Sequence, residues 1–293
     1  MVYCRQAGAK AMARLADREA ETCFTQALEA LQHLPKQRDT LEQAIDLRFD
    51  LRHALARLGD YDQVLVILHE AETLAQTLDD HRRLAQVAAF IAYHYALMGD
   101  YHQAVAPAQR TLVSAEVLGD FTLQVLGNFH LGLAYHGLGD YRRAIDYLRS
   151  NVAALEGEHI YESFATPGLP SVASRSVLVR CLTELGVFAE AIALGEEAVR
   201  IAETVNNPDM LASACRSTPV PYLRKGDLPK AIPLLEHGLG LLYLKTRRQE
   251  QARAALSAAM ALYHAMDMTF WLPQTEAALA QGGSTGAPGK GGS

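Results

Sequence analysis

A tetrapeptide ending in Gly-Asp-Tyr recurs along this chain at a constant interval. Its three copies occupy residues 58–61, 98–101 and 138–141, so their glycines are 40 residues apart. Two weaker copies place Gly186 and Gly226 at the same 40-residue interval, whereas the step from Gly139 to Gly186 is 47 residues. A fixed period of this length means that one small structural unit is repeated, and it therefore limits the fold more strongly than length does.

Each copy of the tetrapeptide predicts a turn between two helices. The glycine can take the left-handed conformation that ends one helix, and the aspartate after it can cap the next. The segments between turns, such as residues 41–58, are rich in Ala, Leu, Glu, Gln and Arg. Their apolar residues follow the 3.6-residue spacing of a helix and not the alternation of a strand. Every unit is therefore expected to be an antiparallel helical hairpin.

Small and large residues recur at fixed distances from each turn, as two closely packed helices require. Around Gly139 the small residues are Gly132 and Ala144, and larger side chains surround them. The same frame recurs at Ala92, Tyr95, Tyr101 and Ala104, at Leu178, Leu182, Phe188 and Ala191, and more weakly at Gly240, Tyr243, Ala252 and Ala259.

These spacings are typical of the tetratricopeptide repeat, in a long-helix form of about 40 residues instead of the commoner 34. We therefore predict an all-α fold, an α-solenoid forming a right-handed superhelix of about six to seven hairpins over residues 1–280. The expected units lie near residues 2–35, 37–79, 80–119, 120–156, 171–206, 207–245 and 246–280. A long loop at 156–170 holds the extra residues, and the Gly/Ser-rich residues 281–293 are expected to be a flexible tail.

Several strings resemble a bacterial family, the C-terminal repeat arm of large multidomain adenylate or guanylate cyclases and related signalling ATPases. They are YCRQAGAKAMAR, QALEALQHLP, LEQAIDLRFDLR, LGLAYHGLGDYRRAIDYLR, PGLPSVASR, YLRKGDLPKAIPLLE and AMDMTFWLPQTEAALA. The resemblance covers nearly the whole chain, but only that arm of the family. It implies a module that senses a partner and gates an enzyme located elsewhere.

Two features depart from the family pattern. Pro219 and Pro221 each remove a backbone donor and are expected to break the first helix of the sixth unit. The marker alanines Ala231 and Ala252 are only 21 residues apart instead of 40, which suggests that half a unit is missing near Glu236 to Leu241. A continuous helix there would leave apolar surface uncovered, so exposed Leu and Tyr side chains, or self-association through the C-terminal units, are expected.

Composition sets limits on partners and location. The net charge is −6, with 27 basic and 33 acidic residues, and the basic residues are dispersed, so nucleic acid is not an expected partner. No stretch approaches the roughly 18 apolar residues of a membrane helix, and the first residues show no signal-peptide pattern. The expectation is a cytoplasmic protein without membrane contact. The four cysteines are scattered, which disfavours a zinc site or a disulfide framework.

The sequence contains no motif for catalysis or cofactor binding. It has no GxxxxGK[ST] phosphate loop, no nucleophile elbow and no HxxxH or HExxH spacing among its 11 histidines. His94, His130 and His136 lie close in repeat register, yet no carboxylate is placed to orient them. We therefore expect that the chain is not an enzyme and has no catalytic, cofactor-binding or metal-ligating residue.

The first helix of each hairpin lines the concave face of a tetratricopeptide superhelix, and repeated positions there face a ligand. Counting back from each turn gives the expected partner-binding residues, which are Asp46, Phe49, Asp50, His53, Arg57, Gln86, Tyr93, Leu97, Phe129, His130, Leu133, His136, Arg180, Glu184, Arg216 and Arg224. Aromatic and imidazole groups between Asp and Arg ends suit a peptide with apolar anchors and unlike ends. The alternative for each residue is that it only packs against the next unit.

The repeat and the missing catalytic motifs together indicate a protein- or peptide-binding scaffold or regulatory module. The family resemblance adds that it derives from the sensor arm of a bacterial cyclase or ATPase signalling protein. The alternative is a regulatory subunit that senses a small molecule with its concave face. The long loop at 156–170 is either a second contact surface or only a connection between two halves of the stack.

Overall fold

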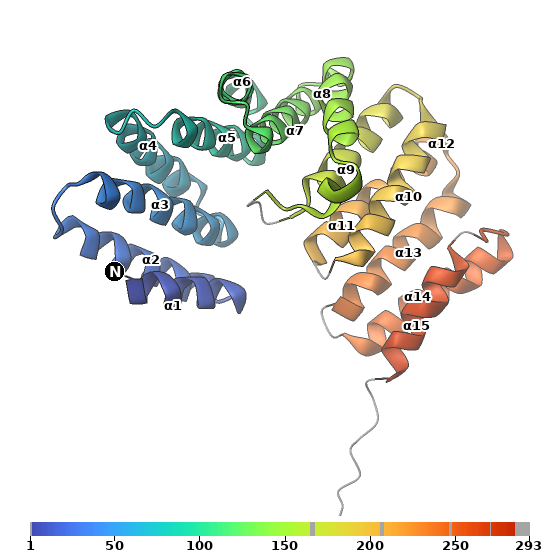
Figure 1. The fold of residues 1–293 in the computed structure, drawn as a ribbon. Helices are drawn as coiled ribbons and strands as arrows, with labels where there is room; N and C mark the ends of the chain where they lie inside the picture. Colours follow the sequence, from blue (N-terminus) through green and yellow to red (C-terminus); the bar gives the residue numbers. More distant parts are fainter. Residues whose placement is uncertain (1, 165–167, 206–207, 246–247, 270, 285–293) are drawn as a thin grey trace, which may run out of the picture. The chain divides into compact units, whose positions relative to one another are not determined.

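The computed structural model describes residues 2–164, 168–205, 208–245, 248–269 and 271–284. Every regular element in these ranges is a helix, which confirms the predicted all-α fold (Figure 1). The chain divides into two compact units, Met1–Leu138 and Gly139–Ser293. The division falls at the turn of the hairpin predicted for residues 120–156.

The helices of the first unit, unit 1, pack in the order in which they follow one another in sequence. In its described residues they are α1 (Val2–Ala13), α2 (Asp17–Gln32), α3 (Arg38–Leu58), α4 (Tyr61–Thr77), α5 (His81–Leu97), α6 (Tyr101–Leu118) and α7 (Phe121–Gly137). In addition, α1 contacts α3 and α5 contacts α7. These two contacts bring the first helices of successive hairpins together, as in a stack of hairpins.

The turns of unit 1 form as predicted. Gly59 and Gly99 have φ values of 79° and 81°, in the left-handed region that favours glycine. The aspartate after each glycine accepts a hydrogen bond from the backbone N–H three residues later, at 3.3 Å for Asp60 and 3.2 Å for Asp100. Asp80 caps α5 in the same way. An aspartate therefore also caps the helix after the turn between two successive hairpins. The repeated tetrapeptide predicts only the turns within hairpins.

The core of unit 1 combines small residues at helix crossings with large side chains between them. Ala54 and Ala71 are completely buried, and Phe24 is 2% exposed. Burying one such large side chain contributes roughly 1.5–3 kcal/mol. Helices α6 and α7 approach so closely that a Cβ atom on Gly127 would lie 3.1 Å from the backbone nitrogen of Leu112. A larger residue at this position would push the two helices apart.

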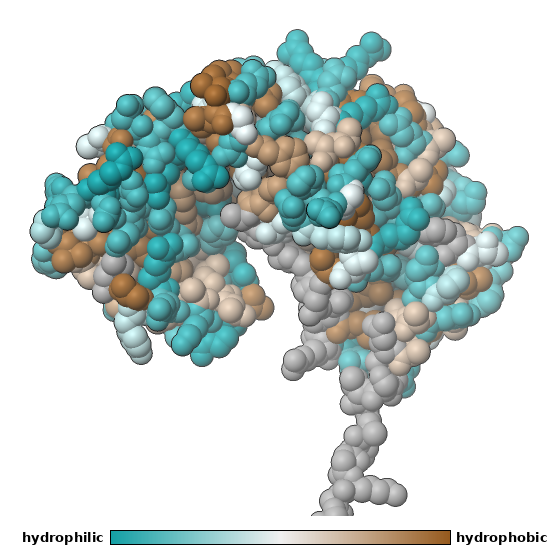
Figure 2. Space-filling model, in the orientation of Figure 1, coloured by the Kyte–Doolittle hydropathy of each residue, from teal (hydrophilic) through white to brown (hydrophobic). Residues whose placement is uncertain are grey.

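Unit 1 exposes a group of hydrophobic side chains on α6. Hydrophobic side chains gather at the position of this helix in Figure 2. The exposed large residues there are Val113, Val117 and Leu118, which are 61, 82 and 42% exposed.

The second unit, unit 2, has the same kind of architecture. Its described elements are α8 (Tyr141–Ala154), the 3₁₀ helix η1 (Gly157–Tyr161), α9 (Pro170–Glu184), α10 (Phe188–Thr204), α11 (Pro208–Ser217), α12 (Val220–Lys225), α13 (Leu228–Lys245), α14 (Gln249–Ala265) and α15 (Leu272–Ser284). Gly139, Gly186 and Gly226 have φ values of 79°, 77° and 76°, which confirms the predicted turns. Element η1 lies in the predicted long loop, of which residues 165–167 are outside the described ranges.

The two prolines interrupt the first helix of the sixth hairpin, as predicted. Helix α11 ends at Ser217 and α12 begins at Val220. Pro219 precedes α12 and Pro221 lies in its first turn, where a backbone N–H would have no partner within the helix. Tyr222 packs, half-buried, against the hydrophobic core of unit 2 despite the break.

One continuous helix accommodates the shortened spacing. Helix α13 runs through Gly238 and Gly240, at points where other helices come close. Added Cβ atoms would lie 2.5 Å from Cys215 Cβ on α11 and 2.5 Å from Leu256 Cγ on α14. Helix α13 is thus the second helix of one hairpin and also the first helix of the next, which it forms with α14. Because the two hairpins share this helix, the marker alanines are 21 residues apart instead of 40.

A row of exposed apolar side chains lies along α13, as predicted for a continuous helix. Leu228, Ile232, Leu235 and Leu239 are 53, 47, 45 and 41% exposed. The prediction of an exposed tyrosine is wrong at Tyr243, which is half-buried. The guanidinium of Arg248 covers part of it, 4.8 Å from the ring centroid.

Helix α15 closes unit 2 against α14. Trp271, just before this helix, is 3% exposed and stacks on Tyr263 with 6.5 Å between ring centroids. The helix reaches Ser284, inside the segment that we expected to be a flexible tail, and residues 285–293 lie outside the described ranges. None of the described helices is long and apolar enough to cross a membrane.

Candidate functional site

Helix α3 of unit 1 carries the first group of predicted partner-binding residues. They recur at helical intervals and share one face, because positions three or four apart are neighbours on a helix. They are Asp46, Phe49, Asp50, His53 and Arg57. All of them except Arg57 are half-buried, as residues at the boundary between core and solvent are.

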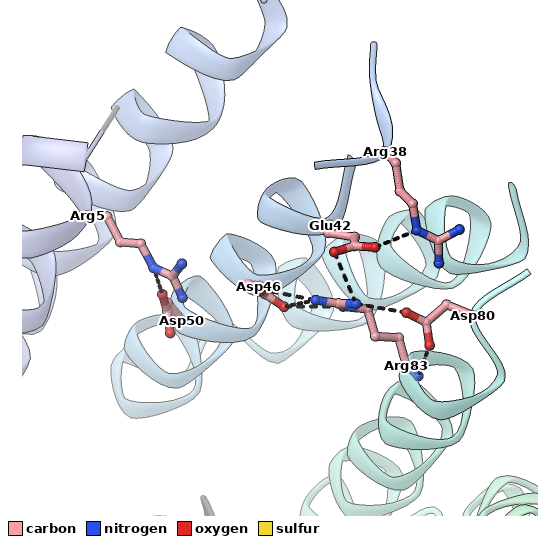
Figure 3. Close-up of polar contacts among 7 residues, drawn as sticks. All are labelled: Arg5, Arg38, Glu42, Asp46, Asp50, Asp80 and Arg83. Atoms are coloured by element: carbon pink, nitrogen blue, oxygen red, sulfur yellow. Dashed lines mark hydrogen bonds and ion pairs between the residues drawn. The ribbon is translucent and has the colours of Figure 1, made fainter. Parts of the chain in front are cut away.

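Both aspartates on this face are paired with arginines from neighbouring helices (Figure 3). Arg5 on α1 donates from Nε to Asp50 at 2.8 Å, and Arg83 on α5 lies 3.3 Å from Asp46. Arg83 also pairs with Asp80 at 2.8 Å. Burial raises the pKa of Asp50, and the charge of Arg5 opposes this shift. These contacts neutralise the acidic end that the sequence interpretation assigned to a ligand, and they join α1 and α5 to α3.

An aromatic row extends from α3 to α5 and α7. Phe49 and Phe90 meet edge to face, with ring centroids 5.0 Å apart and planes at 81°. Tyr93 and Phe129 each lie beside His130, at centroid distances of 5.5 and 5.6 Å. The four aromatic rings are all half-buried. Their remaining surface is available to apolar anchors, which aromatic residues bind well at interfaces.

A buried arginine lies beside this row. Arg52 on α3 is only 6% exposed, and its Cζ atom lies 3.7 Å from the centroid of the Phe90 ring. Its Nη2 lies 2.6 Å from Nε2 of His53, and its Nε–H has no acceptor. No Asp or Glu of the described chain forms an ion pair with it; the phenol of Tyr93 is the group that opposes the effect of burial on its charge. Burial lowers the pKa of Arg52 to about 10, so it stays cationic at neutral pH.

The two histidines next to Arg52 are uncharged at neutral pH. Burial, with a smaller contribution from the charge of Arg52, lowers the pKa of His53 and that of His130 to about 3. Nδ1 of His130 is buried without a hydrogen-bond partner. Burial also raises the pKa of Tyr93. The centre of this face is therefore cationic and retains polar atoms that unit 1 itself does not use.

The other predicted residues of unit 1 have different surroundings from one another. Arg57 is exposed and pairs at 3.1 Å with the aspartate that begins α2. Leu97 is 43% exposed at the end of α5, and Leu133 packs into a small alanine-rich cluster. Gln86 and His136 are half-buried on α5 and α7.

The remaining predicted residues belong to unit 2. Arg224 on α12 donates to Glu184 at the end of α9 at 2.7 Å. Arg180 is half-buried on α9, and Arg216 is exposed in the last turn of α11. The predicted set is thus divided between two units, and its charged members in unit 2 include one internal ion pair.

Sequence reasoning missed the residues that organise the site. Arg52 immediately precedes His53, which was chosen. Phe90 lies on α5 between the chosen Gln86 and Tyr93. Arg5 and Arg83 pair with aspartates that were chosen. Arg52 had a signal, because it is a charged residue within the apolar run LRHALARL, at a position next to His53. A charge at a core-facing position usually has a partner in the fold. The sequence does not show whether Arg52 has one.

Three other features of the described residues bear on possible chemistry: groups of metal ligands, thiols and a pocket. They contain no group of three or more His, Cys, Asp or Glu side chains that could hold a metal ion. All four cysteines are free thiols, and Cys181 and Cys215 are buried. A shallow pocket in unit 2 is lined partly by Glu196, Tyr222 and Trp271, but it includes none of the predicted partner-binding residues.

Comparisons with known proteins agree with this architecture. A model of the tetratricopeptide repeat matches residues 127–150. A search of curated proteins finds no match. The apo form of RapI is similar in structure, with a TM-score of 0.65, 12% identity, and coverage of 96% of this chain and 95% of that one.

Two ligand-bound structures are also similar. A Rap protein complexed with Competence and Sporulation Factor has a TM-score of 0.63 and 16% identity, and the match covers 95% of this chain and 73% of that one. NprR in complex with its cognate peptide NprX has a TM-score of 0.54 and 14% identity, with 95% and 81% covered. At these identities the similarity establishes a tetratricopeptide-type helical repeat fold.

Proposed function

We propose that this chain is a peptide-binding regulatory module and that its ligand lies on the face formed by α3, α5 and α7 of unit 1. The observation that carries the proposal is the row of half-buried rings, Phe49, Phe90, Tyr93 and Phe129, around a cationic centre. Aromatic residues of this kind anchor apolar side chains of a ligand. The peptide-bound state of NprR, which has a similar fold, supports the same role.

The origin of the module is a second part of the proposal. The seven strings quoted above support derivation from the sensor arm of a bacterial cyclase or ATPase signalling protein. In that setting, ligand binding to the repeats would be transmitted to an enzyme on another chain or domain. The coding sequence next to this one tests the idea, because a cyclase or ATPase portion beside the repeats would support it and unrelated neighbours would count against it.

The binding role can be tested without knowing the ligand. Peptides from a random display library are selected on the full chain, and their affinities are measured by fluorescence anisotropy for wild type, Phe49→Ala and Val117→Ala. Loss of an aromatic anchor at an interface commonly weakens binding by about tenfold or more, since it costs upwards of about 1.4 kcal/mol. Val117 is a matched control, because it is exposed on α6 and outside the proposed face.

Phe49→Ala should reduce the affinity of selected peptides, and Val117→Ala should leave it unchanged. Equal effects of the two variants would contradict the proposed location. A large thermal shift with a small metabolite, together with no enrichment of any peptide, would favour the alternative of small-molecule sensing.

Self-association through the C-terminal hairpins is also part of the proposal. It is supported by the exposed row Leu228, Ile232, Leu235 and Leu239 on α13. Light scattering on the full chain should show a concentration-dependent dimer that Leu235→Glu abolishes. A monomer at all concentrations would remove this part of the proposal.

A further inference from the structure

The guanidinium of Arg52 is a buried cation that has no anionic partner in the part of the chain that the structure describes. Burial of a charge is costly unless opposite charge and hydrogen bonds compensate it. Arg52 is 6% exposed, and among the described residues the hydrogen-bonding contact of its side chain is the 2.6 Å approach of Nη2 to His53. That histidine is a neutral acceptor, and Nε–H of Arg52 has none. Unit 1 therefore leaves the positive charge uncompensated.

The other arginines on this face are already occupied. Arg5 holds Asp50 at 2.8 Å, and Arg83 holds Asp46 and Asp80 at 3.3 and 2.8 Å. A negatively charged ligand group that arrives at this face would meet a carboxylate already bound at either of them. At Arg52 it would displace only the neutral ring of His53.

The surroundings of Arg52 suit a planar oxyanion. Its ring partner Phe90 covers one side of the guanidinium at 3.7 Å, so the edge of the guanidinium is left for hydrogen bonds. An arginine fork donates to both oxygens of a carboxylate at once, and such charge-assisted bonds are about twice as strong as neutral ones. His53 and Tyr93, which flank the position, are half-buried and so border the solvent from which a ligand would come.

We propose that Arg52 receives one carboxylate of the bound peptide, which replaces His53 as the acceptor of its hydrogen bonds. The carboxylate belongs either to the C-terminus of the peptide or to an Asp or Glu side chain. This inference rests on the peptide-binding function proposed above and adds a chemical requirement to it. The aromatic row holds apolar side chains, and Arg52 fixes the position of one negative charge.

The test observes Arg52 directly in the wild-type chain. The ¹⁵N-labelled Arg Nε–H resonances are recorded by NMR, and that of Arg52 is assigned by its loss in Arg52→Lys. The probes are N-acetyl-leucine, which carries an α-carboxylate, and the α-amide of N-acetyl-glutamate, which carries a side-chain carboxylate. N-acetyl-leucinamide and sodium chloride at matched ionic strength are the neutral and salt controls.

A saturable shift of the Arg52 resonance with a carboxylate probe, and none with the controls, is the expected result. The probe that saturates at lower concentration identifies the source of the carboxylate. Arg175 of unit 2 is the internal reference, since it already donates to Glu197 at 3.0 Å and should not respond. An Arg52 resonance that does not move, or that moves equally with chloride, would overturn the proposal.

A second measurement separates failure of this inference from failure of the proposed function. The affinity of a selected peptide should fall at least tenfold in Arg52→Met and stay within twofold in Arg110→Met, whose side chain is exposed on α6. Equal binding by wild type and Arg52→Met would refute the carboxylate contact while leaving peptide binding in place. A shifted Arg52 resonance with no selectable peptide would refute the peptide role and leave a carboxylate site.

Discussion

Two buried arginines, one in each unit, have opposite electrostatic surroundings. Arg175 on α9 of unit 2 is 1% exposed, and it donates to Glu197 at 3.0 Å and to the carbonyl oxygen of Ser171 at 3.2 Å. Arg52 on α3 of unit 1 is 6% exposed and has no carboxylate partner. Both leave Nε–H without an acceptor, so the difference between them is the carboxylate.

The two arginines differ in whether the fold itself supplies a counterion for the buried charge. In unit 2 the counterion comes from the second helix of the same hairpin, α10, so the ion pair is complete when the hairpin folds. In unit 1 the corresponding acceptor is a neutral imidazole, so no opposite charge offsets the cost of burying the charge of Arg52. Functional sites commonly retain such unfavourable features, because ligand binding then relieves them.

Removing the carboxylate in unit 2 should give the largest effect. Glu197→Gln leaves the Arg175 guanidinium buried without its counterion, and removing the partner of a buried charged group costs about 2–3 kcal/mol. Urea denaturation followed by circular dichroism measures this loss. Glu190→Gln is the matched control on the same helix, because Glu190 and its partner Arg149 are 39 and 53% exposed. An exposed pair contributes only about 0.5 kcal/mol, so similar losses in both variants would show that Arg175 is not a buried charge.

His130 should make the free energy of unfolding depend on pH, by about 2 kcal/mol. Its pKa is lowered to about 3 in the folded chain from an ordinary value near 6.5, so the unfolded chain binds the proton first. Stability from this group is complete above about pH 6.5 and is lost as the pH falls toward 3. Between pH 7 and 5 the loss is about 2 kcal/mol.

His130→Phe keeps a ring beside Tyr93 and Arg52 but removes the titration. The stability difference between wild type and this variant should therefore change by about 2 kcal/mol from pH 7 to pH 5, to the disadvantage of wild type. Urea midpoints at both pH values test the point. A pH-independent difference would show that His130 is not the neutral, buried group described here.

The charge of Arg52 should cost stability instead of adding to it. Arg52→Met keeps an unbranched side chain against Phe90 and removes the uncompensated cation. Replacing a buried charge by an apolar side chain of similar size is often neutral or stabilising, and we expect a gain of about 1 kcal/mol or less. The melting temperature of the ligand-free chain measures it. A loss of more than about 1 kcal/mol would place Arg52 in the same structural class as Arg175.

The smallest effect is expected at the ion pair between Arg5 and Asp50. Both side chains are substantially exposed, at 40 and 35%, and such pairs contribute roughly 0.2–1 kcal/mol. Arg5→Ala should therefore lower stability by about 0.5 kcal/mol and less at high salt. Salt screens the interaction between exposed charges. If the loss is the same in about 0.05 M and about 1 M sodium chloride, it comes from lost packing and not from lost charge.

The fold could be predicted from sequence because its determinants are local. The glycine at each turn requires a left-handed φ, and the aspartate after it caps a helix, so the period alone specifies hairpins. The break at Pro219 and the exposed row on α13 were predictable for the same reason. The use of α13 by two hairpins was not, because it depends on how closely α14 can approach Gly240.

The candidate site was predictable only in part. Counting from the turns selects Phe49, Tyr93 and His130, which the structure brings together in the proposed face. It does not show which charges neutralise one another, because Arg5 and Asp50 come from different hairpins and meet only after stacking. It also passed over Arg52, whose importance comes from a missing partner and not from a residue pattern.

The proposed site for the peptide lies on α3, α5 and α7 of unit 1. Hydrogen–deuterium exchange on the full chain, with and without a peptide selected from the library, tests it most directly. Peptide binding to this face should slow exchange in residues 46–57, 83–97 and 126–137, with little change in α9 to α13. Slower exchange confined to residues 168–245, with α3, α5 and α7 unchanged, would contradict it.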